Sequence, residues 1–243
     1  ASYAIAVKES NTTVSFIEMN GNASAHLGFW THADETGIVF RNNLVHNFGS
    51  SSDADADVYI MKSNNSVIFM NNFVFNNTSG SSADLFVQWG SPSYAHFFYN
   101  NTYYYNVVGD NTSNYGYIFY SALSQGGSAV KNIILLRYSD NPSGNDIWNT
   151  HSAGATTSYW GAAGAIAGVS SVTTDTYGNA FLDTSTSDPD LHLKTGTNFI
   201  DAAVDLGTSP TNVEIDINGN NRDSSGVTWD LGAHEFGLSP PSA

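Results

Sequence analysis

Residues 40–47 read Phe-Arg-Asn-Asn-Leu-Val-His-Asn, and residues 69–76 repeat the pattern as Phe-Met-Asn-Asn-Phe-Val-Phe-Asn. Residues 98–105 carry it again as Phe-Tyr-Asn-Asn-Thr-Tyr-Tyr-Tyr, and residues 129–136 as Ala-Val-Lys-Asn-Ile-Ile-Leu-Leu. Aligned on the second Asn of each pair, the segments are 29, 29 and 31 residues apart. The aligned column contains Asn43, Asn72, Asn101 and Asn132. A period of this length indicates stacked repeats.

The columns of this alignment differ in character, as two faces of a strand should. The column that starts with Phe40 is apolar, which predicts stacking in a core, whereas the column that starts with Arg41 is mixed, as an outward position is. The uniform Asn column marks a sharp bend between two strands, because Asn tolerates the left-handed backbone that such a bend needs. Stacked Asn side chains also form hydrogen bonds along the stack.

These features predict an all-β protein, a right-handed parallel β-helix with coils of about 29 residues. An antiparallel meander of hairpins is the alternative, but the hairpin signals Asn20-Gly21 and Asn218-Gly219 fall outside the repeat. We expect residues 1–30 to form N-terminal strands or a first coil, and residues 31–150 to form the regular coils. Residues 151–243 should hold a small-residue segment and a closing tail.

The composition excludes some partners. Seven basic residues face 22 acidic ones in 243 residues, for a formal net charge of −15. Nucleic acid and anionic membrane surfaces are poor partners for such a chain, because binding phosphates requires Lys and Arg. A divalent cation such as Ca²⁺ suits the charge better. The absence of cysteine excludes disulfides and a Cys nucleophile.

The C-terminal third holds the segments Asp188-Pro-Asp-Leu-His-Leu, Asp216-Ile-Asn-Gly-Asn-Asn-Arg222 and Asp230-Leu-Gly-Ala-His-Glu235. Together they resemble the closing segment of secreted bacterial parallel β-helix repeat proteins. The resemblance implies a β-helix and an extracellular or cell-surface location. It does not choose a chemistry, because this fold hosts polysaccharide lyases, hydrolases, adhesins and structural proteins. Within the tail we expect the scarce cation Arg222 to pair with Asp216, Asp230 or Glu235 and so to lock the segment.

A cluster of three acidic residues is the candidate metal site. Asp53, Asp55 and Asp57 alternate with Ala, which places all three carboxylates on one face if the segment is extended. A Ca²⁺ ion would relieve their mutual repulsion, and a solvated acidic loop is the alternative. No certain cofactor follows from the sequence, and Ca²⁺ is the one cofactor that we consider.

No pair of catalytic residues is evident in the sequence. A lyase site on a β-helix needs basic residues close together, but Arg41 and Lys131 fall in adjacent columns three coils apart. A hydrolase needs paired carboxylates. We therefore assign no catalytic residue and lean towards a protein that is not an enzyme. The aromatic richness leaves carbohydrate recognition open, with Trp89 and Tyr104 as the candidate sugar-stacking residues.

Two functions stay open at this point. The first is an extracellular structural or surface protein, such as an adhesin or a filament, with a second copy of the chain as its partner. Strand addition by Tyr3-Ala-Ile-Ala-Val7 would drive the assembly, unless residues 1–8 fold back onto their own first coil. The second is a carbohydrate-active β-helix, either a polysaccharide lyase or hydrolase or a glycan-binding module. Membrane insertion is not expected, since no apolar run approaches 20 residues.

Overall fold

The structure is a computed structural model, and it describes residues 3–22, 27–31, 35–48, 59–62, 66–77, 86–89, 95–104, 119–120, 129–136, 175–185, 188–225 and 228–238. Their strands form three parallel sheets. Sheet A contains β1 (Tyr3–Val7), β4 (Leu27–Thr31), β7 (Tyr59–Lys62), β10 (Phe86–Trp89) and β13 (Phe119–Tyr120). Sheet B contains β2 (Thr13–Ser15), β5 (Ile38–Arg41), β8 (Val67–Met70), β11 (Phe97–Tyr99) and β14 (Ala129–Lys131). Sheet C contains β3 (Glu18–Asn20), β6 (Leu44–His46), β9 (Phe73–Phe75), β12 (Thr102–Tyr104) and β15 (Ile134–Leu136).

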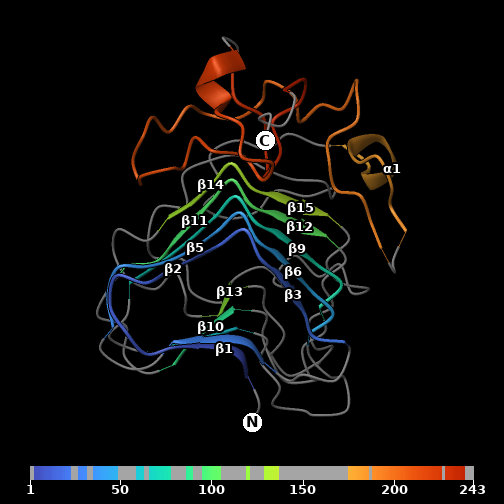
Figure 1. The fold of residues 1–243 in the computed structure, drawn as a ribbon. Helices are drawn as coiled ribbons and strands as arrows, with labels where there is room; N and C mark the ends of the chain where they lie inside the picture. Colours follow the sequence, from blue (N-terminus) through green and yellow to red (C-terminus); the bar gives the residue numbers. More distant parts are fainter. Residues whose placement is uncertain are drawn as a thin grey trace.

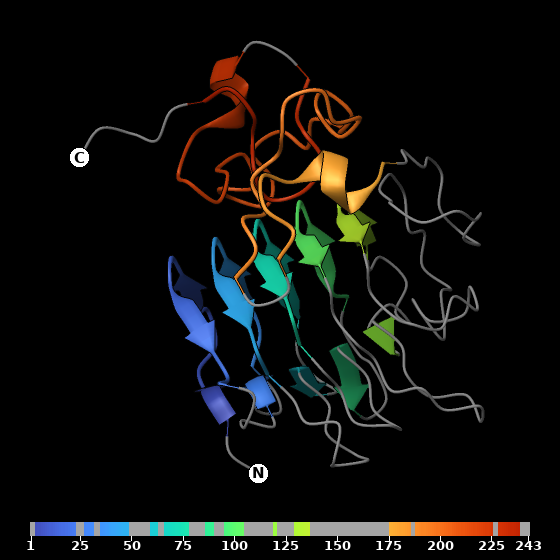
Figure 2. The ribbon, with the colours of Figure 1, turned by 90° about the vertical axis from the view of Figure 1, so that its right-hand side faces the viewer.

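The chain visits the sheets in the order A, B, C and then begins the next coil, so every sheet is parallel throughout. Viewed with the first coil nearest the reader, the chain runs clockwise as it recedes, which makes the helix right-handed (Figures 1 and 2). Sheets B and C meet at a sharp bend, and sheet A closes the triangle below them (Figure 1). The predicted fold, a right-handed parallel β-helix, is confirmed.

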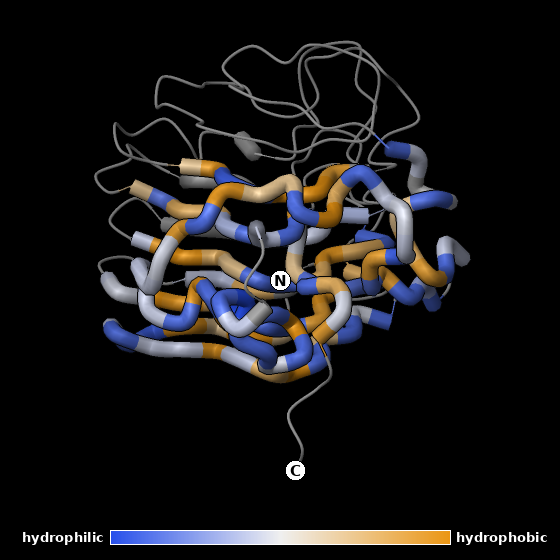
Figure 3. Tube along the Cα trace, turned by 90° about the horizontal axis from the view of Figure 1, so that it is seen from above, coloured by the Kyte–Doolittle hydropathy of each residue, from blue (hydrophilic) through white to orange (hydrophobic). Residues whose placement is uncertain are grey.

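Large apolar side chains stack inside the helix because equivalent positions of successive coils pair directly. Phe40 pairs with Phe69, and Phe69 with Phe98. Their ring centroids are 6.0 and 6.2 Å apart, and all three side chains are buried. In sheet C, Val45, Val74 and Tyr103 form a second buried column. Figure 3 shows hydrophobic positions recurring on neighbouring strands.

The predicted register is wrong for the fourth segment. Phe98 pairs with Val130 rather than Ala129, so Asn132 lies over Asn100, 32 residues earlier, and not over Asn101. Ile133, buried in the interior, takes the place in line with Asn101. A segment with a single Asn aligns equally well with either Asn of the earlier pairs, and only the backbone conformation decides between them.

The left-handed residue of each bend is the first Asn of the pair, not the second as the alignment suggested. Asn42, Asn71, Asn100 and Asn132 have φ values of 54°, 54°, 51° and 53°. This conformation is costly for most side chains and mild for Asn. It reverses the side-chain alternation at the corner, so the first Asn faces outward and the second faces the core. We call the outward column, Asn42, Asn71, Asn100 and Asn132, the Asn ridge.

The inward column, Asn43, Asn72 and Asn101, forms a ladder of hydrogen bonds that we call the Asn ladder. The Asn72 amide nitrogen donates to the Phe40 carbonyl at 3.1 Å, and its Oδ1 accepts from the Asn43 backbone N–H at 3.0 Å. Asn101 repeats both bonds one coil further on, to the Phe69 carbonyl at 2.7 Å and from the Asn72 N–H at 3.0 Å. Each inward amide therefore satisfies two buried backbone groups of the preceding bend.

The C-terminal residues fold back over the corner between sheets B and C, as Figures 1 and 2 show. The Asn ridge binds them through side-chain amides. Asn42 donates to the carbonyls of Ile215, at 3.1 Å, and Asp216. Asn71 and Asn100 donate to the Val213 carbonyl at 3.1 and 3.0 Å. Asn132 exchanges two bonds with the Val204 backbone, at 2.7 and 3.1 Å.

This tail, residues 175–238, begins with α1 (Tyr177–Ala180) and includes the 3-10 helix η1 (Arg222–Ser225). It creates a second hydrophobic core outside the β-helix, against the outer faces of sheets B and C. The buried members of that core are Met70, Phe73, Phe75, Tyr99, Tyr104, Ala129, Ile134, Ala180, Phe181, Leu191, Leu193, Phe199, Ala203, Val213, Ile217, Trp229, Leu231 and Ala233. Gly232 sits where the tail backbone packs tightly against sheet C, since a Cβ there would lie 2.5 Å from the Thr102 hydroxyl.

The three predicted divisions of the chain can be placed on the described strands and tail. Residues 3–20 form a complete first coil, in which β1 pairs with β4 of the same chain. Regular coils continue to Leu136, and the tail begins at Asp175. The predicted small-residue segment that opens the third division lies outside the described residues as far as residue 174.

The Asn ladder predicts a large loss of stability from one truncation. Asn72→Ala leaves the Phe40 carbonyl and the Asn43 N–H without their partners in a buried bend, at about 1–3 kcal/mol each. We expect the free energy of unfolding, measured with urea, to fall by about 2–4 kcal/mol. The exposed Thr195→Ala is the control and should change the free energy of unfolding by less than about 0.5 kcal/mol. Equal effects of the two variants would contradict the role of the ladder.

Candidate functional site

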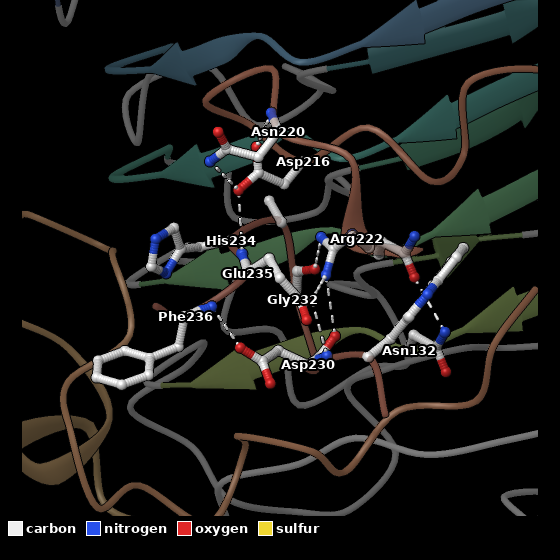
Figure 4. A network of polar contacts seen from close by, with 12 residues as sticks. Asn132, Asp216, Asn220, Arg222, Asp230, Gly232, His234, Glu235 and Phe236 are labelled. Carbon is white, nitrogen blue, oxygen red and sulfur yellow. Dashed lines mark hydrogen bonds and ion pairs between the residues drawn. The ribbon is translucent and has the colours of Figure 1, made fainter. Parts of the chain in front are cut away.

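The tail is held closed by a buried cation. Arg222 is fully buried and donates from NH1 to Glu235 Oε2 at 2.9 Å, in an ion pair with both side chains at most 1% exposed. It also donates to the carbonyls of Asp230 and Gly232, at 3.2 and 2.8 Å. Figure 4 shows these bonds converging on the guanidinium group. Arg222 thus ties its own segment to the backbone of residues 230–232 and to one carboxylate.

Asp216 and Asp230, the other two acids assigned to Arg222, bind backbone N–H groups instead. Asp216 Oδ1 accepts from Asn218 and Asn220, at 2.9 and 2.7 Å, which fixes the turn that carries Asn218. Asp230 Oδ1 accepts from Asp201 at 2.7 Å. Their charges still favour the Arg222 cation through space. Of the three acids, only Glu235 is a direct ion-pair partner.

We call the Arg222–Glu235 ion pair the clamp, and burial is the main influence on the pKa values of both its groups. It raises the pKa of the Glu235 carboxyl to about 7, although Arg222 opposes the shift. It also lowers the pKa of the Arg222 guanidinium, again against the pull of Glu235. The carboxylate is the form that fits the geometry, because Glu235 Oε2 accepts from both Arg222 and the Asp230 N–H. The clamp is therefore an ion pair maintained in a dry environment.

Beside the clamp, the tail and the outer face of sheet C enclose a groove of about 440 Å³. We call it the sheet C groove. Its lining residues are Leu44, Phe73, Phe75, Asp183, Asp188, Pro189, Asp190, Leu191, His192, Ile217 and Asn218. The floor is apolar, from β6, β9 and the tail. The rim carries three carboxylates, an imidazole and a side-chain amide. A small apolar-floored cavity with a few polar groups is the usual form of a ligand site.

His192 organises the polar side of the groove. Its Nδ1 lies 2.5 Å from Asp190 Oδ1, and its Nε2 lies 3.0 Å from Asn218 Oδ1. Its ring packs edge-on against Phe73 and against His234. His234 accepts the Leu193 N–H at Nδ1, and burial lowers the pKa of His234 to about 3, so that it stays neutral. The Leu193 backbone thus fixes the His234 ring, against which the His192 ring packs.

The charge state of Asp190 bears on the chemistry of the groove. Burial alone would raise the pKa of this carboxyl, but the hydrogen bonds from His192 outweigh burial and lower it. Asp190 is therefore ionised near neutral pH and is a hydrogen-bond acceptor. Glycoside hydrolysis needs one carboxylic acid that stays protonated. Glu235 has a raised pKa, but it lies in the tail core and does not line the groove.

The residues assigned to sugar stacking do not form this site. Tyr104 is fully buried under the tail, and its hydroxyl donates to the Thr184 carbonyl at 2.8 Å, so it offers no face to a ligand. This corrects the prediction, which did not foresee that the tail covers the outer face of sheet C. Trp89 ends β10, and its side chain lies outside the described residues.

The predicted Ca²⁺ site at Asp53, Asp55 and Asp57 also lies outside the described residues. In the part of the chain that the structure does describe, no group of three or more metal-ligating side chains is arranged to hold a metal. Over the same residues, no helix is long and apolar enough to cross a bilayer.

Sequence reasoning missed Asp190, His192 and Asn218 as a group. All three lie in two of the three tail segments that carry the family resemblance, but His192 and Asn218, which bond to each other, are 26 residues apart in the sequence. The available signal was the outward column of sheet C, where Phe73 and Phe75 are apolar although a solvated face would be polar. An apolar outer face indicates that something covers it.

No protein-family model matches the sequence, and no curated protein matches it. Among solved structures, the chain is similar to QnrB1 (full length), a plasmid-mediated fluoroquinolone resistance protein, at 10% sequence identity and a TM-score of 0.14. That similarity covers 73% of this chain and 94% of the other. A similarity of this extent says nothing about family or function, and the fold rests on the sheet topology.

The Arg222–Glu235 ion pair makes a prediction that distinguishes the contribution of charge pairing to stability from that of side-chain packing. Arg222→Met leaves Glu235 buried without its cation, and we expect the free energy of unfolding to fall by about 3–5 kcal/mol. Adding Glu235→Gln removes the stranded charge, so the double variant should recover part of the loss. Urea denaturation measures both, with the exposed Lys194→Met as the control. An unchanged denaturation curve for Arg222→Met would show that the Arg222–Glu235 pair contributes nothing to stability.

Proposed function

We propose that this protein is an extracellular, non-catalytic β-helix that binds neutral saccharides in the sheet C groove. The observation that carries the proposal is the combination of an apolar floor with a rim of hydrogen-bond acceptors. A pyranose ring has apolar C–H faces and hydroxyl groups at its edge. Carboxylates such as Asp183, Asp188 and Asp190 accept from hydroxyl donors, and such charge-assisted bonds are strong.

The charge of the groove selects among saccharides. Three carboxylates on one rim repel uronates and sulfated glycans, and the chain carries a formal charge of −15 overall. Neutral sugars meet no such penalty. The size also fits, because a cavity of about 440 Å³ falls within the range of small-molecule sites.

Binding rather than cleavage is favoured by Asp190, whose lowered pKa makes it a poor general acid. The resemblance of the tail to secreted bacterial β-helix repeat proteins supports the extracellular location and a surface role, as in an adhesin.

Isothermal titration with neutral hexasaccharides of glucose, mannose and xylose, and with oligogalacturonate, tests the proposal. The informative variant is Asp188→Ala, because Asp188 is an exposed part of the rim. Loss of one charge-assisted hydrogen bond should weaken binding of a neutral sugar about tenfold. Asp205→Ala, which removes an equal charge outside the groove, should leave affinity unchanged. Failure of every neutral sugar to bind, or equal losses in both variants, would refute the proposal.

Self-association is a second candidate function, and one feature favours it. At the corner of the first coil, Phe16 and Ile17 stand where later coils have an Asn pair, and they are 55% and 38% exposed. Phe16 also adopts a left-handed backbone with φ of 55°, which is unfavourable for a bulky residue. Exposed apolar side chains beside the outer edges of β1, β2 and β3 suit docking of a second copy.

The double variant Phe16→Asn, Ile17→Asn tests this candidate without damaging the fold, because it installs the pair that the next three coils use. We expect the wild type to show a concentration-dependent increase in mass by light scattering, and the variant to remain monomeric. The variant should melt no lower than the wild type, since Asn relieves the left-handed strain. Leu182→Asn, at another exposed apolar residue, is the control. A monomeric wild type at high concentration would rule out this function.

A further inference from the structure

A second groove lies on the other flank of the corner, between the outer face of sheet B and the tail. Its volume is about 470 Å³. It is lined by Thr13, Val39, Arg41, Ile68, Met70, Ser209, Pro210, Thr211 and Asn212. We call it the sheet B groove. Val39, Ile68 and Met70 make an apolar floor, hydroxyls stand on the tail wall, and Arg41 is the one charged residue among the residues that line it.

The register corrects the position of the basic residues. Arg41 pairs with Met70, Met70 with Tyr99, and Tyr99 with Lys131. Arg41 and Lys131 therefore share one outward column of sheet B, where the sequence alignment had placed them in adjacent columns. The off-by-one alignment of the fourth segment accounts for the difference.

Arg41 has no acidic partner among the described residues, in a chain with 22 acidic side chains and seven basic ones. Its guanidinium donates one hydrogen bond, from NH1 to Asn42 Oδ1 at 3.2 Å, and lies 5.4 Å above the Phe16 ring. Five N–H donors are available on this group. The two contacts hold the side chain in place without neutralising it. By contrast, Arg222, the buried arginine of the tail, has its carboxylate.

A half-buried, unneutralised guanidinium beside an apolar floor is complementary to one class of ligand. Arginine binds carboxylates through two parallel hydrogen bonds. An apolar body attached to that carboxylate would cover the part-exposed side chains of Val39 and Ile68, and the hydroxyls of Thr13 and Thr211 lie on the rim. We propose that the sheet B groove binds an organic monocarboxylate with an apolar body, with Arg41 receiving the carboxylate.

This assignment is independent of the saccharide proposal, because the two grooves have opposite charge and lie on opposite flanks of the corner. The sheet C groove repels the ligand that the sheet B groove attracts. A phosphate or sulfate ion would satisfy Arg41 but not the floor, so the apolar body distinguishes the proposed ligand from a simple anion.

The test titrates the intact protein with phenylacetate and hexanoate, and with their uncharged amides, and follows amide chemical shifts by NMR. We expect saturable shifts at residues of the sheet B groove, with each amide about tenfold weaker than its acid. Arg41→Met keeps the aliphatic stem and should weaken the acids about tenfold while leaving the amides unaffected. Lys194→Met removes the same charge at an exposed site in the tail and should change neither.

The proposal is overturned by no saturable shift with either acid, by equal binding of acid and amide, or by equal losses in Arg41→Met and Lys194→Met. Inorganic phosphate that binds as well as phenylacetate would show that the groove is an unselective anion site, which also overturns it. If Arg41→Met fails to fold, Arg41→Gln with the same ligands and the acid-to-amide comparison on the wild type keep the test decisive.

Discussion

The structure depends on the paired asparagines at the bend between sheets B and C. One Asn of each pair must take a left-handed conformation to turn the corner, and the turn places its neighbour inside the helix. The inward amide replaces the backbone partners that the bend has lost, for example at Phe40 and Asn43. The outward amide faces away from the core instead. What it holds is the tail, whose backbone carbonyls lie along the Asn ridge.

The tail converts the outer surface of the solenoid into two different grooves. It lies along the corner and leaves a groove on each flank, where it overhangs the outer faces of sheets B and C. The two flanks inherit opposite charge from the residues beside them: three carboxylates over sheet C, and Arg41 over sheet B. The Arg222 clamp fixes the tail internally, and Gly232 allows it to approach Thr102 closely.

The sequence was sufficient to predict the parallel β-helix, because the repeat carries the core columns directly. It was also sufficient to predict that Arg222 pairs with Asp216, Asp230 or Glu235, since a lone Arg among acidic residues in an apolar tail needs a partner, but it did not single out Glu235. It was insufficient at Asn132, where one Asn matched two possible positions. It was insufficient at Tyr104, whose apparent exposure on an outer face was removed by a tail 80 residues further along the chain. Both grooves are products of long-range packing, which no local pattern encodes.

The central claim is that the Asn ridge, rather than the coils as a whole, holds the tail in place. Replacing Asn42, Asn71 and Asn100 together by Gly keeps the left-handed backbone available and deletes the side-chain bonds to the tail, together with the bonds that Arg41 and Asn132 donate to this column. Amide hydrogen exchange measured by NMR then reports on each part separately. Protection should fall at Ile217, Arg222 and Glu235 in the tail and persist in β5, β8 and β11. Unchanged protection in the tail, or an equal loss throughout the coils, would contradict the account.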